Sequence, residues 1–309
     1  MLTKLNCVRL SIVVCTYNRS KLLQRCLNAL VNQSASTDSF EVIIIDNNST
    51  DDTLAISAEY AQNYKNIRCL KEDRIGLSHA RNRGWREAKG TYVAYLDDDA
   101  EPVDSWLSTI FDFVGRRPDV VMFGGPYVSF SLTSRPYWFP PEYGVMDFGA
   151  VERSLDIRTE FVEGLNMVIR KDELEKSEGF HSDLGMSGTK VYYGEETRLQ
   201  ILLSREGHTI YYVPGMAVRH LLPAYKMSLL WLLKSVYANG RSSCLTFDSN
   251  RTLLQHMMGV AYGIYFFFNT LPQQLGQPLK RLIYYSLRPI ISECGALVEF
   301  FVRLWRGKS

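Results

Sequence analysis

The stretch that decides the fold is Tyr92-Val93-Ala94-Tyr95-Leu96-Asp97-Asp98-Asp99-Ala100-Glu101-Pro102. Five apolar residues lead directly into three carboxylates, and we expect Pro102 to end the extended segment. A short apolar run bounded by a turn signal is typical of a strand buried on both faces of a sheet. Three adjacent Asp side chains repel one another unless a cation compensates them, and hard oxygen ligands suit Mg²⁺ or Mn²⁺. An Asp-rich loop exposed to water is the alternative.

Strand and helix patterns alternate before this stretch. Apolar runs at residues 10–15, 41–45 and 67–70 predict three further strands, and apolar residues at helical spacing follow each of them. Such alternation is typical of βαβ units, so we predict an α/β fold with a mostly parallel sheet.

Polar clusters come at the ends of three of these predicted strands. They occupy residues 16–19, 46–52 and 97–99. Because ligands of open α/β sheets bind at the carboxyl ends of the strands, we predict a nucleotide site there. The sequence has neither a P-loop nor a G-x-G-x-x-G pattern after the first strand. A metal and basic side chains would therefore hold the phosphates, with Arg81 as a candidate; a surface arginine is the alternative.

Composition sets limits on the class of protein. The chain has 309 residues, enough for one large domain or for a domain of about 220 residues with an appendage. Its net charge of +2 is too small to favour nucleic acid as a partner. Six scattered cysteines favour reduced thiols, and the first apolar run is too short for a signal peptide. We therefore expect a cytoplasmic location.

An ordered series of motifs resembles glycosyltransferase family 2. The motifs are SIVVCTYNR (residues 11–19), IDNNSTD (45–51), GLSHARN (76–82), LDDD (96–99), GLNMVIR (164–170), GF (179–180) and GEE (194–196). The resemblance covers about residues 9–240. It implies a GT-A fold, in which a Rossmann-like nucleotide-binding half (about 1–125) is joined to an acceptor half (about 126–240). It also implies a hexosyltransferase that moves a sugar from a nucleoside diphosphate, with UDP favoured, and inverts the anomeric carbon.

The family's nucleoside pocket maps onto the first two polar clusters. By resemblance, Thr16, Tyr17 and Arg19 line the base pocket, and Asp46 accepts a hydrogen bond from the base. Tyr17 is alternatively a simple aromatic at a strand end. A carboxylate that ends a buried strand needs a donor partner, which favours the functional interpretation of Asp46.

The family's D-x-D position maps onto the three aspartates. The resemblance implies that Asp97 and Asp98 face the nucleotide and that Asp97 and Asp99 bind Mg²⁺ or Mn²⁺. His220 is the last residue of a predicted strand at residues 217–220 and is a candidate third ligand, with a structural histidine as the alternative.

The acceptor half carries the predicted base. The resemblance assigns Gly164 and Asn166 to the acceptor. Glu195 and Glu196 are at the start of a predicted helix, where the helix dipole favours carboxylates, so helix capping without a catalytic role is one interpretation. The family usually has Glu-Asp here with the Asp as base; Glu196 takes that position, and Glu195 is the alternative base. An aromatic and proline-rich segment at residues 126–156 covers the acceptor or is ordinary loop packing.

Residues 241–309 predict a helical, apolar tail. Residues 252–279 contain no Asp, Glu, Lys or Arg, and residues 253–271 have about the length of a bilayer crossing. Residues 279–305 mix apolar residues with arginines, which is typical of a helix at a membrane surface. The alternative is a helical hairpin that packs on the catalytic domain or forms a homo-oligomer.

We therefore predict an inverting, metal-dependent glycosyltransferase at the inner face of the cell membrane. Its partners would be a nucleotide-sugar donor, a glycan or lipid-linked acceptor and the membrane surface. A sugar nucleotidyltransferase, which releases pyrophosphate, is one alternative. A non-catalytic nucleotide-binding membrane scaffold is the other.

Overall fold

The computed structural model describes residues 10–188, 190–272 and 276–306. The chain divides into two compact units, which we describe separately. Unit 1 consists of Met1–Ser129, Gly144–Ser182 and Leu199–Leu221, and unit 2 of Phe130–Tyr143, Asp183–Arg198 and Leu222–Ser309. The domain boundary predicted at residue 240 falls inside a helix of unit 2, α7 (Leu229–Thr246).

Unit 1 is built around an eight-stranded sheet. In spatial order its strands are β3 (Ile67–Lys71), β2 (Phe40–Asp46), β1 (Leu10–Thr16), β4 (Tyr92–Leu96), β10 (Asn166–Arg170), β6 (Met122–Gly124), β11 (Ile210–Tyr212) and β9 (Arg153–Ser154). β1 pairs in parallel with β2 and β4, and β2 pairs in parallel with β3. β10 runs antiparallel to both β4 and β6. The predicted α/β class with a mostly parallel sheet is confirmed.

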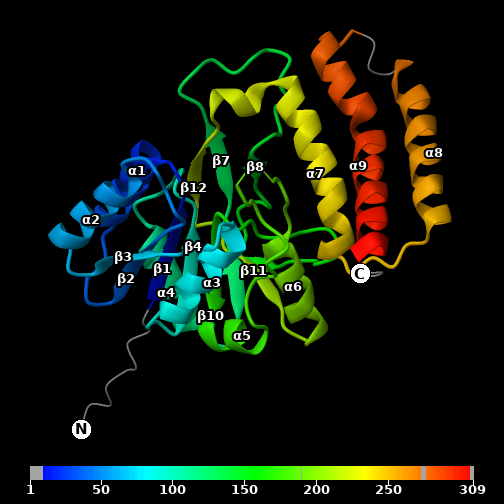
Figure 1. Cartoon of the computed structure of the whole chain (residues 1–309). Helices are drawn as coiled ribbons and strands as arrows, with labels where there is room; N and C mark the ends of the chain where they lie inside the picture. Colours follow the sequence, from blue (N-terminus) through cyan, green and yellow to red (C-terminus); the bar gives the residue numbers. More distant parts are fainter. Residues whose placement is uncertain (1–9, 189, 273–275, 307–309) are drawn as a thin grey trace. The chain divides into compact units, whose positions relative to one another are not determined.

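Both faces of this sheet are covered (Figure 1). Side chains alternate along β1, so that Ile12 and Val14 join one apolar core while Val13 joins the other. All five residues of β4 are buried, as predicted. The first core includes side chains of α1 (Ser20–Val31) and α4 (Trp106–Arg116), and the second includes side chains of α3 (Leu77–Glu87), α5 (Lys171–Lys176) and α6 (Glu195–Arg205). α2 (Thr53–Asn63) packs against β3.

A second, four-stranded sheet continues from the aspartates. Its order is β5 (Ala100–Pro102), β12 (Val218–Leu221), β7 (Tyr127–Phe130) and β8 (Val145–Met146). Pro102 ends β5, as expected. Asp97, Asp98 and Asp99 therefore form a turn between strands of two different sheets.

Unit 2 is helical. Its elements are a 3₁₀ helix, η1 (Ala224–Met227), followed by α7, α8 (Leu253–Thr270) and α9 (Leu279–Arg306). Trp138 and Phe139 pack against Leu232 and Tyr284 of these helices, so this part of the aromatic segment is in the core of the unit. The predicted helical tail is confirmed. None of the helices that the structure describes has the combination of length and apolar character that a membrane crossing requires.

Candidate active site

The strand order reverses between β1 and β4. β2 and β3 extend the sheet on one side of β1, and β4 lies on its other side. At such a reversal the connecting loops diverge and leave a crevice at the carboxyl ends of the strands. Residues 16–19 follow β1 and residues 97–99 follow β4. The two predicted polar clusters therefore meet at the switch point.

Arg19 is paired with two of the aspartates. Its Nη1 donates hydrogen bonds to Asp98 Oδ1 and Asp99 Oδ2, both at 2.9 Å. Both carboxylates are buried. Burial raises the pKa of Asp98 to about 6, with the Arg19 charge lowering it and the Asp99 charge raising it. Arg19 thus supplies the positive charge that two buried carboxylates require. Its guanidinium contacts Asp98 and Asp99, which the resemblance assigns to binding of the nucleotide and the metal ion.

His220 comes to the aspartates through strand pairing. β12 and β5 are antiparallel, with His220 opposite Ala100, and the Leu221 N–H donates to the Asp99 carbonyl at 2.9 Å. His220 Nε2 consequently lies 3.0 Å from Asp99 Oδ1. The rings of His220 and Tyr127 are nearly perpendicular, with centroids 5.9 Å apart.

Asp97, Asp99 and His220 fit a divalent cation. Each offers one ligand atom, and these atoms lie within 4.8 Å of one another. Two carboxylate oxygens and an imidazole nitrogen form a donor set that Mn²⁺ accepts, while Mg²⁺ favours the oxygens. The predicted ligands are thus brought together by the fold.

Arg81 of α3 is buried rather than a surface arginine. Its guanidinium carbon lies 5.9 Å from the ring centroid of Tyr95 and 5.6 Å from that of Phe180. Its Nη2 is 3.4 Å from Asp97 Oδ1. At Gly164 a Cβ would lie 2.8 Å from Arg81 Nη1, so glycine leaves the room that this guanidinium occupies.

Asn82 is a site residue to which the sequence analysis assigned no role. Its Nδ2 donates to the Phe180 carbonyl at 2.7 Å, and its Oδ1 accepts from the Phe180 N–H at 2.8 Å. This pair of bonds fixes the ring that covers Arg81. The signal in the sequence was its place in the GLSHARN motif, together with the later GF motif.

The loops after β1 and β2 are joined by hydrogen bonds. Asn18 adopts a left-handed conformation with φ of 53°, and its Oδ1 accepts from the Thr50 N–H at 2.7 Å. Asp46 is buried and accepts from the Ser49 N–H at 3.2 Å. Thr16, also buried, lies beside Asp46 in the strand register, whereas Tyr17 is 41% exposed. The Tyr17 ring is therefore accessible to a planar ligand.

Asn166 is held inside the protein. It has no exposed surface, its Oδ1 accepts from Trp106 Nε1 at 2.9 Å, and its Nδ2 donates to the carbonyls of Pro126 and Met216. These bonds favour a structural role over the acceptor contact that the resemblance implies.

Glu195 and Glu196 are the first two residues of α6 and belong to unit 2. Glu195 is buried and Glu196 is half-buried. The turn before them is fixed by α7, because Ser242 Oγ accepts from the Tyr193 N–H at 2.9 Å. The structure thus holds both carboxylates at a helix N-terminus, where they are electrostatically favoured.

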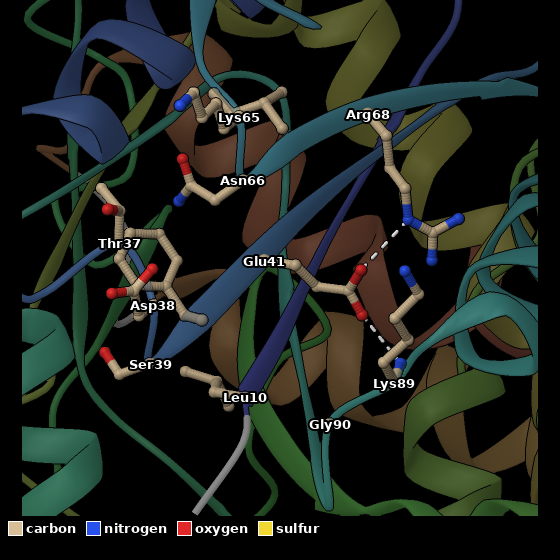
Figure 2. A pocket seen from close by; sticks show the side chains of 12 residues that line it. Leu10, Thr37, Asp38, Ser39, Glu41, Lys65, Asn66, Arg68, Lys89 and Gly90 are labelled. Atoms are coloured by element: carbon tan, nitrogen blue, oxygen red, sulfur yellow. Dashed lines mark hydrogen bonds and ion pairs between the residues drawn. The ribbon is translucent and has the colours of Figure 1, made fainter.

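A separate pocket lies at the amino ends of β1, β2 and β3 (Figure 2). Glu41 points into it, and Figure 2 shows its contacts with Arg68 and Lys89. None of the predicted site residues lines this pocket.

The comparison with protein families decides the assignment. A family model described as glycosyl transferase family 2 matches residues 11–176, more than half of the chain. The chain belongs to glycosyltransferase family 2. A glucosyl-dolichyl phosphate glucuronosyltransferase of Haloferax volcanii is 24% identical over 242 residues, 76% of either chain. Glycosyltransferase AglE of the same organism is 26% identical over 274 residues, covering 88% of this chain and 85% of its own.

Solved structures agree on the fold. A mannosyltransferase from Pyrobaculum calidifontis, in complex with GDP-Man and Mn²⁺, superimposes with a TM-score of 0.58 at 17% identity, over 95% of this chain and 75% of its own. S. aureus TarS 1–349 in complex with UDP-GlcNAc gives 0.56 at 16% identity, over 96% and 92%. This family 2 chain is a glycosyltransferase with the predicted GT-A fold, which sets aside the nucleotidyltransferase and scaffold alternatives.

Proposed function

We propose that this glycosyltransferase moves a sugar from a nucleoside diphosphate donor, with a UDP-sugar favoured, to a hydroxyl of a glycan or lipid-linked acceptor, with inversion at the anomeric carbon. The cluster of Asp97, Asp99 and His220 beside Arg19 is the observation that carries the proposal. A departing diphosphate needs positive charge near its oxygens. The nucleotide-sugars in two solved relatives and the dolichyl phosphate named for one sequence relative support this choice.

The donor would lie across the switch point. Tyr17 would pack against the base, and Asp46 would accept a hydrogen bond from it. Asp97, Asp99 and His220 would hold the divalent cation, which when bound neutralises charge on the diphosphate. The resemblance puts Thr16 and Arg19 at the base. Because Arg19 is paired with Asp98 and Asp99, we assign it to the surroundings of the phosphates instead. Thr16, whose side chain lies against Asp98, shares this assignment with Asp98 and Arg81.

The acceptor hydroxyl would be activated by a carboxylate. Glu196 takes the hydroxyl proton, and the oxygen forms a bond to the anomeric carbon while the bond from that carbon to the diphosphate oxygen breaks. The bonding electron pair leaves with the nucleoside diphosphate. Glu195 is the alternative base. Of the two residues that the resemblance assigns to the acceptor, we propose this role for Gly164, which lies next to Arg81, and not for Asn166.

The test is a donor screen with the whole chain. UDP- and GDP-sugars are offered with polyprenyl phosphate and glycan acceptors, with and without Mn²⁺, and release of the nucleoside diphosphate is measured. We expect acceptor- and metal-dependent release of UDP, and a product whose anomeric configuration is inverted by NMR. Asp99→Asn should lower kcat/KM by at least about 100-fold, whereas the exposed Asp104→Asn should not. Release of pyrophosphate, or retained configuration, would contradict the proposal.

Work at the inner face of the cell membrane and homo-oligomerisation through the C-terminal helices remain predictions.

A further inference from the structure

The outer face of α8 is apolar. We use this name for the exposed side chains that fall within one half of the helix circumference at 3.6 residues per turn. They are Leu253, Leu254, Met257, Met258, Ala261, Tyr262, Ile264, Tyr265 and Phe268, together with one polar side chain, Asn269, whose Nδ2 donates to the Tyr265 carbonyl within the helix. Leu254 and Phe268 are each 67% exposed. The surrounding residues 252–279 contain no charged side chain, so water would meet a wide apolar surface.

A histidine and an ion pair lie on the inner side of α8, whereas Gln255 and Asn269 of the same helix are exposed. His256 is buried, with its ring centroid 5.3 Å from that of Phe300 in α9. The ion pair of Arg251 and Glu293 lies against Gly259, at 3.1 Å between Nη1 and Oε2. A helix on a water-exposed surface has the opposite arrangement, with its polar side outward. Polar side chains that face the interior of a helical bundle are typical of an apolar surrounding medium.

The last turns of α9 extend this surface. α8 and α9 pack with His256 near Phe300 and Gly263 near Ile290, so they run antiparallel. Phe301, Leu304 and Trp305, which are 50%, 48% and 76% exposed, are accordingly at the Leu253 end of α8. Arg303 and Arg306 interleave with them.

Charge indicates which partner covers the surface. Residues 222–306 contain nine Lys or Arg and three Asp or Glu. Each of the three acids is already paired with an arginine of unit 2: Asp248 with Arg198, Glu293 with Arg251 and Glu299 with Arg241. The remaining excess is positive, which suits an anionic lipid surface. A second copy of this region would bring the same positive charge, and one partner helix covers a stripe rather than half a circumference.

We propose that the outer face of α8, extended by the end of α9, docks on the surface of a bilayer that contains anionic lipid, with the helix lying in the interface. The tyrosines place apolar rings and polar tips at the depth where such side chains are favoured. The test of this proposal does not depend on the proposed sugar transfer, because vesicle binding is measured without donor or acceptor.

The test is flotation of the full chain with vesicles of phosphatidylcholine and about one-third phosphatidylglycerol, in about 0.15 M salt. We expect the wild type to float with the vesicles. The double variant Leu254→Glu, Phe268→Glu should partition at least about tenfold less, because each carboxylate resists entry into the interface. The matched control Leu132→Glu, Val151→Glu alters side chains that are 69% and 70% exposed outside α8 and α9, and should partition like the wild type.

Two results would overturn the proposal. One is a wild type that stays with the aqueous phase. The other is a double variant that floats like the wild type. Sedimentation velocity without lipid tests whether a second copy of the chain covers the surface instead. A wild type that is dimeric and does not bind vesicles, with a double variant that is monomeric, would assign the surface to a second copy. Should the double variant fail to fold, Met258→Gln, Tyr265→Gln gives the same comparison without added charge.

Discussion

At the scale of single residues, Arg81 shows how the site keeps a charge in a buried place. Two aromatic rings lie beside the guanidinium, Asp97 lies at 3.4 Å, and Gly164 has no Cβ in its way. A cation between aromatic faces is stabilised by the ring quadrupoles, more so when water is excluded. Its position therefore depends on neighbours in three separate segments of the chain, at residues 95–97, 164 and 180.

Gly164→Ala should displace this guanidinium, because the new Cβ would lie 2.8 Å from Nη1. We expect KM for the nucleotide-sugar to rise about tenfold with a smaller effect on kcat, as for a loss of donor binding. Steady-state kinetics measure it. Gly115→Ala is the control, since a Cβ at that helical position meets nothing within 4 Å, and its kinetics should match the wild type. An unchanged KM in Gly164→Ala would separate Arg81 from the donor.

The choice between the two glutamates is also a single-residue question. If Glu196 is the base, Glu196→Gln should lower kcat by about 10²- to 10⁴-fold with little change in KM, because proton removal occurs in the transition state. Glu195→Gln serves as the matched variant and should retain most activity. A large loss of kcat in Glu195→Gln, with activity retained in Glu196→Gln, would make Glu195 the base. If both variants are active, neither residue is the base.

Single-residue roles were only partly predictable from the sequence. Asp98 and Asp99 follow a recognisable buried strand, so their place near the loop that carries Arg19 at the switch point followed from topology. The metal-site geometry of His220 depends on the register of β5 and β12, which no local pattern encodes. Asn166 was assigned to the acceptor by its motif, and the three separate segments that surround its amide were not evident from the sequence.

At the scale of elements, Glu41 joins three strands and a helix end around the pocket of Figure 2. Ser11 Oγ of β1 donates to it at 2.7 Å, Arg68 Nε of β3 at 3.0 Å and the Lys89 N–H at 2.7 Å. Burial alone would raise its pKa, but these donors outweigh burial, and the pKa of Glu41 is lowered from its ordinary value of 4.5.

Glu41→Gln should lower the free energy of unfolding by about 1–2 kcal/mol at pH 7. Because the folded-state pKa is lowered, the carboxylate stabilises the fold above 4.5, and this contribution is lost as pH falls through the folded-state pKa. Urea unfolding at pH 7 and in acid measures the difference, which should shrink in acid. Glu59→Gln on the exposed side of α2 should change stability by less than about 0.5 kcal/mol at either pH. A difference that grows in acid would contradict this account.

Arg281 connects α9 to the segment at residues 130–143, which also belongs to unit 2. It donates to the carbonyls of Trp138, Tyr137 and Phe139 at 2.9, 2.7 and 3.1 Å. Arg281→Ala should free residues 130–143 and speed proteolytic cleavage there about tenfold, since local opening limits cleavage. Mass spectrometry of the fragments measures it. Arg288→Ala, at an exposed position of α9, should cleave at the wild-type rate; equal rates in both variants would show that Arg281 does not hold the segment.

At the scale of the whole molecule, the sequence predicted the sheet better than the division of the chain. Buried strands such as β4 are short apolar runs, so the positions of β1 to β4 along the chain followed from pattern, whereas the spatial order of the sheet did not. The two units are each assembled from separate segments, and α7 groups with α8 and α9 rather than with the sheet. Such grouping depends on packing between segments far apart in sequence, which periodicity does not reveal.

The central claim is that Asp97, Asp99 and His220 hold the cation that accompanies the donor. Calorimetric titration of Mn²⁺ into the protein in the presence of UDP tests it most directly. The account predicts one bound ion, with a Kd that rises at least about tenfold in Asp99→Asn and stays unchanged in the exposed Asp104→Asn. Equal Mn²⁺ affinity in wild type and Asp99→Asn would contradict it.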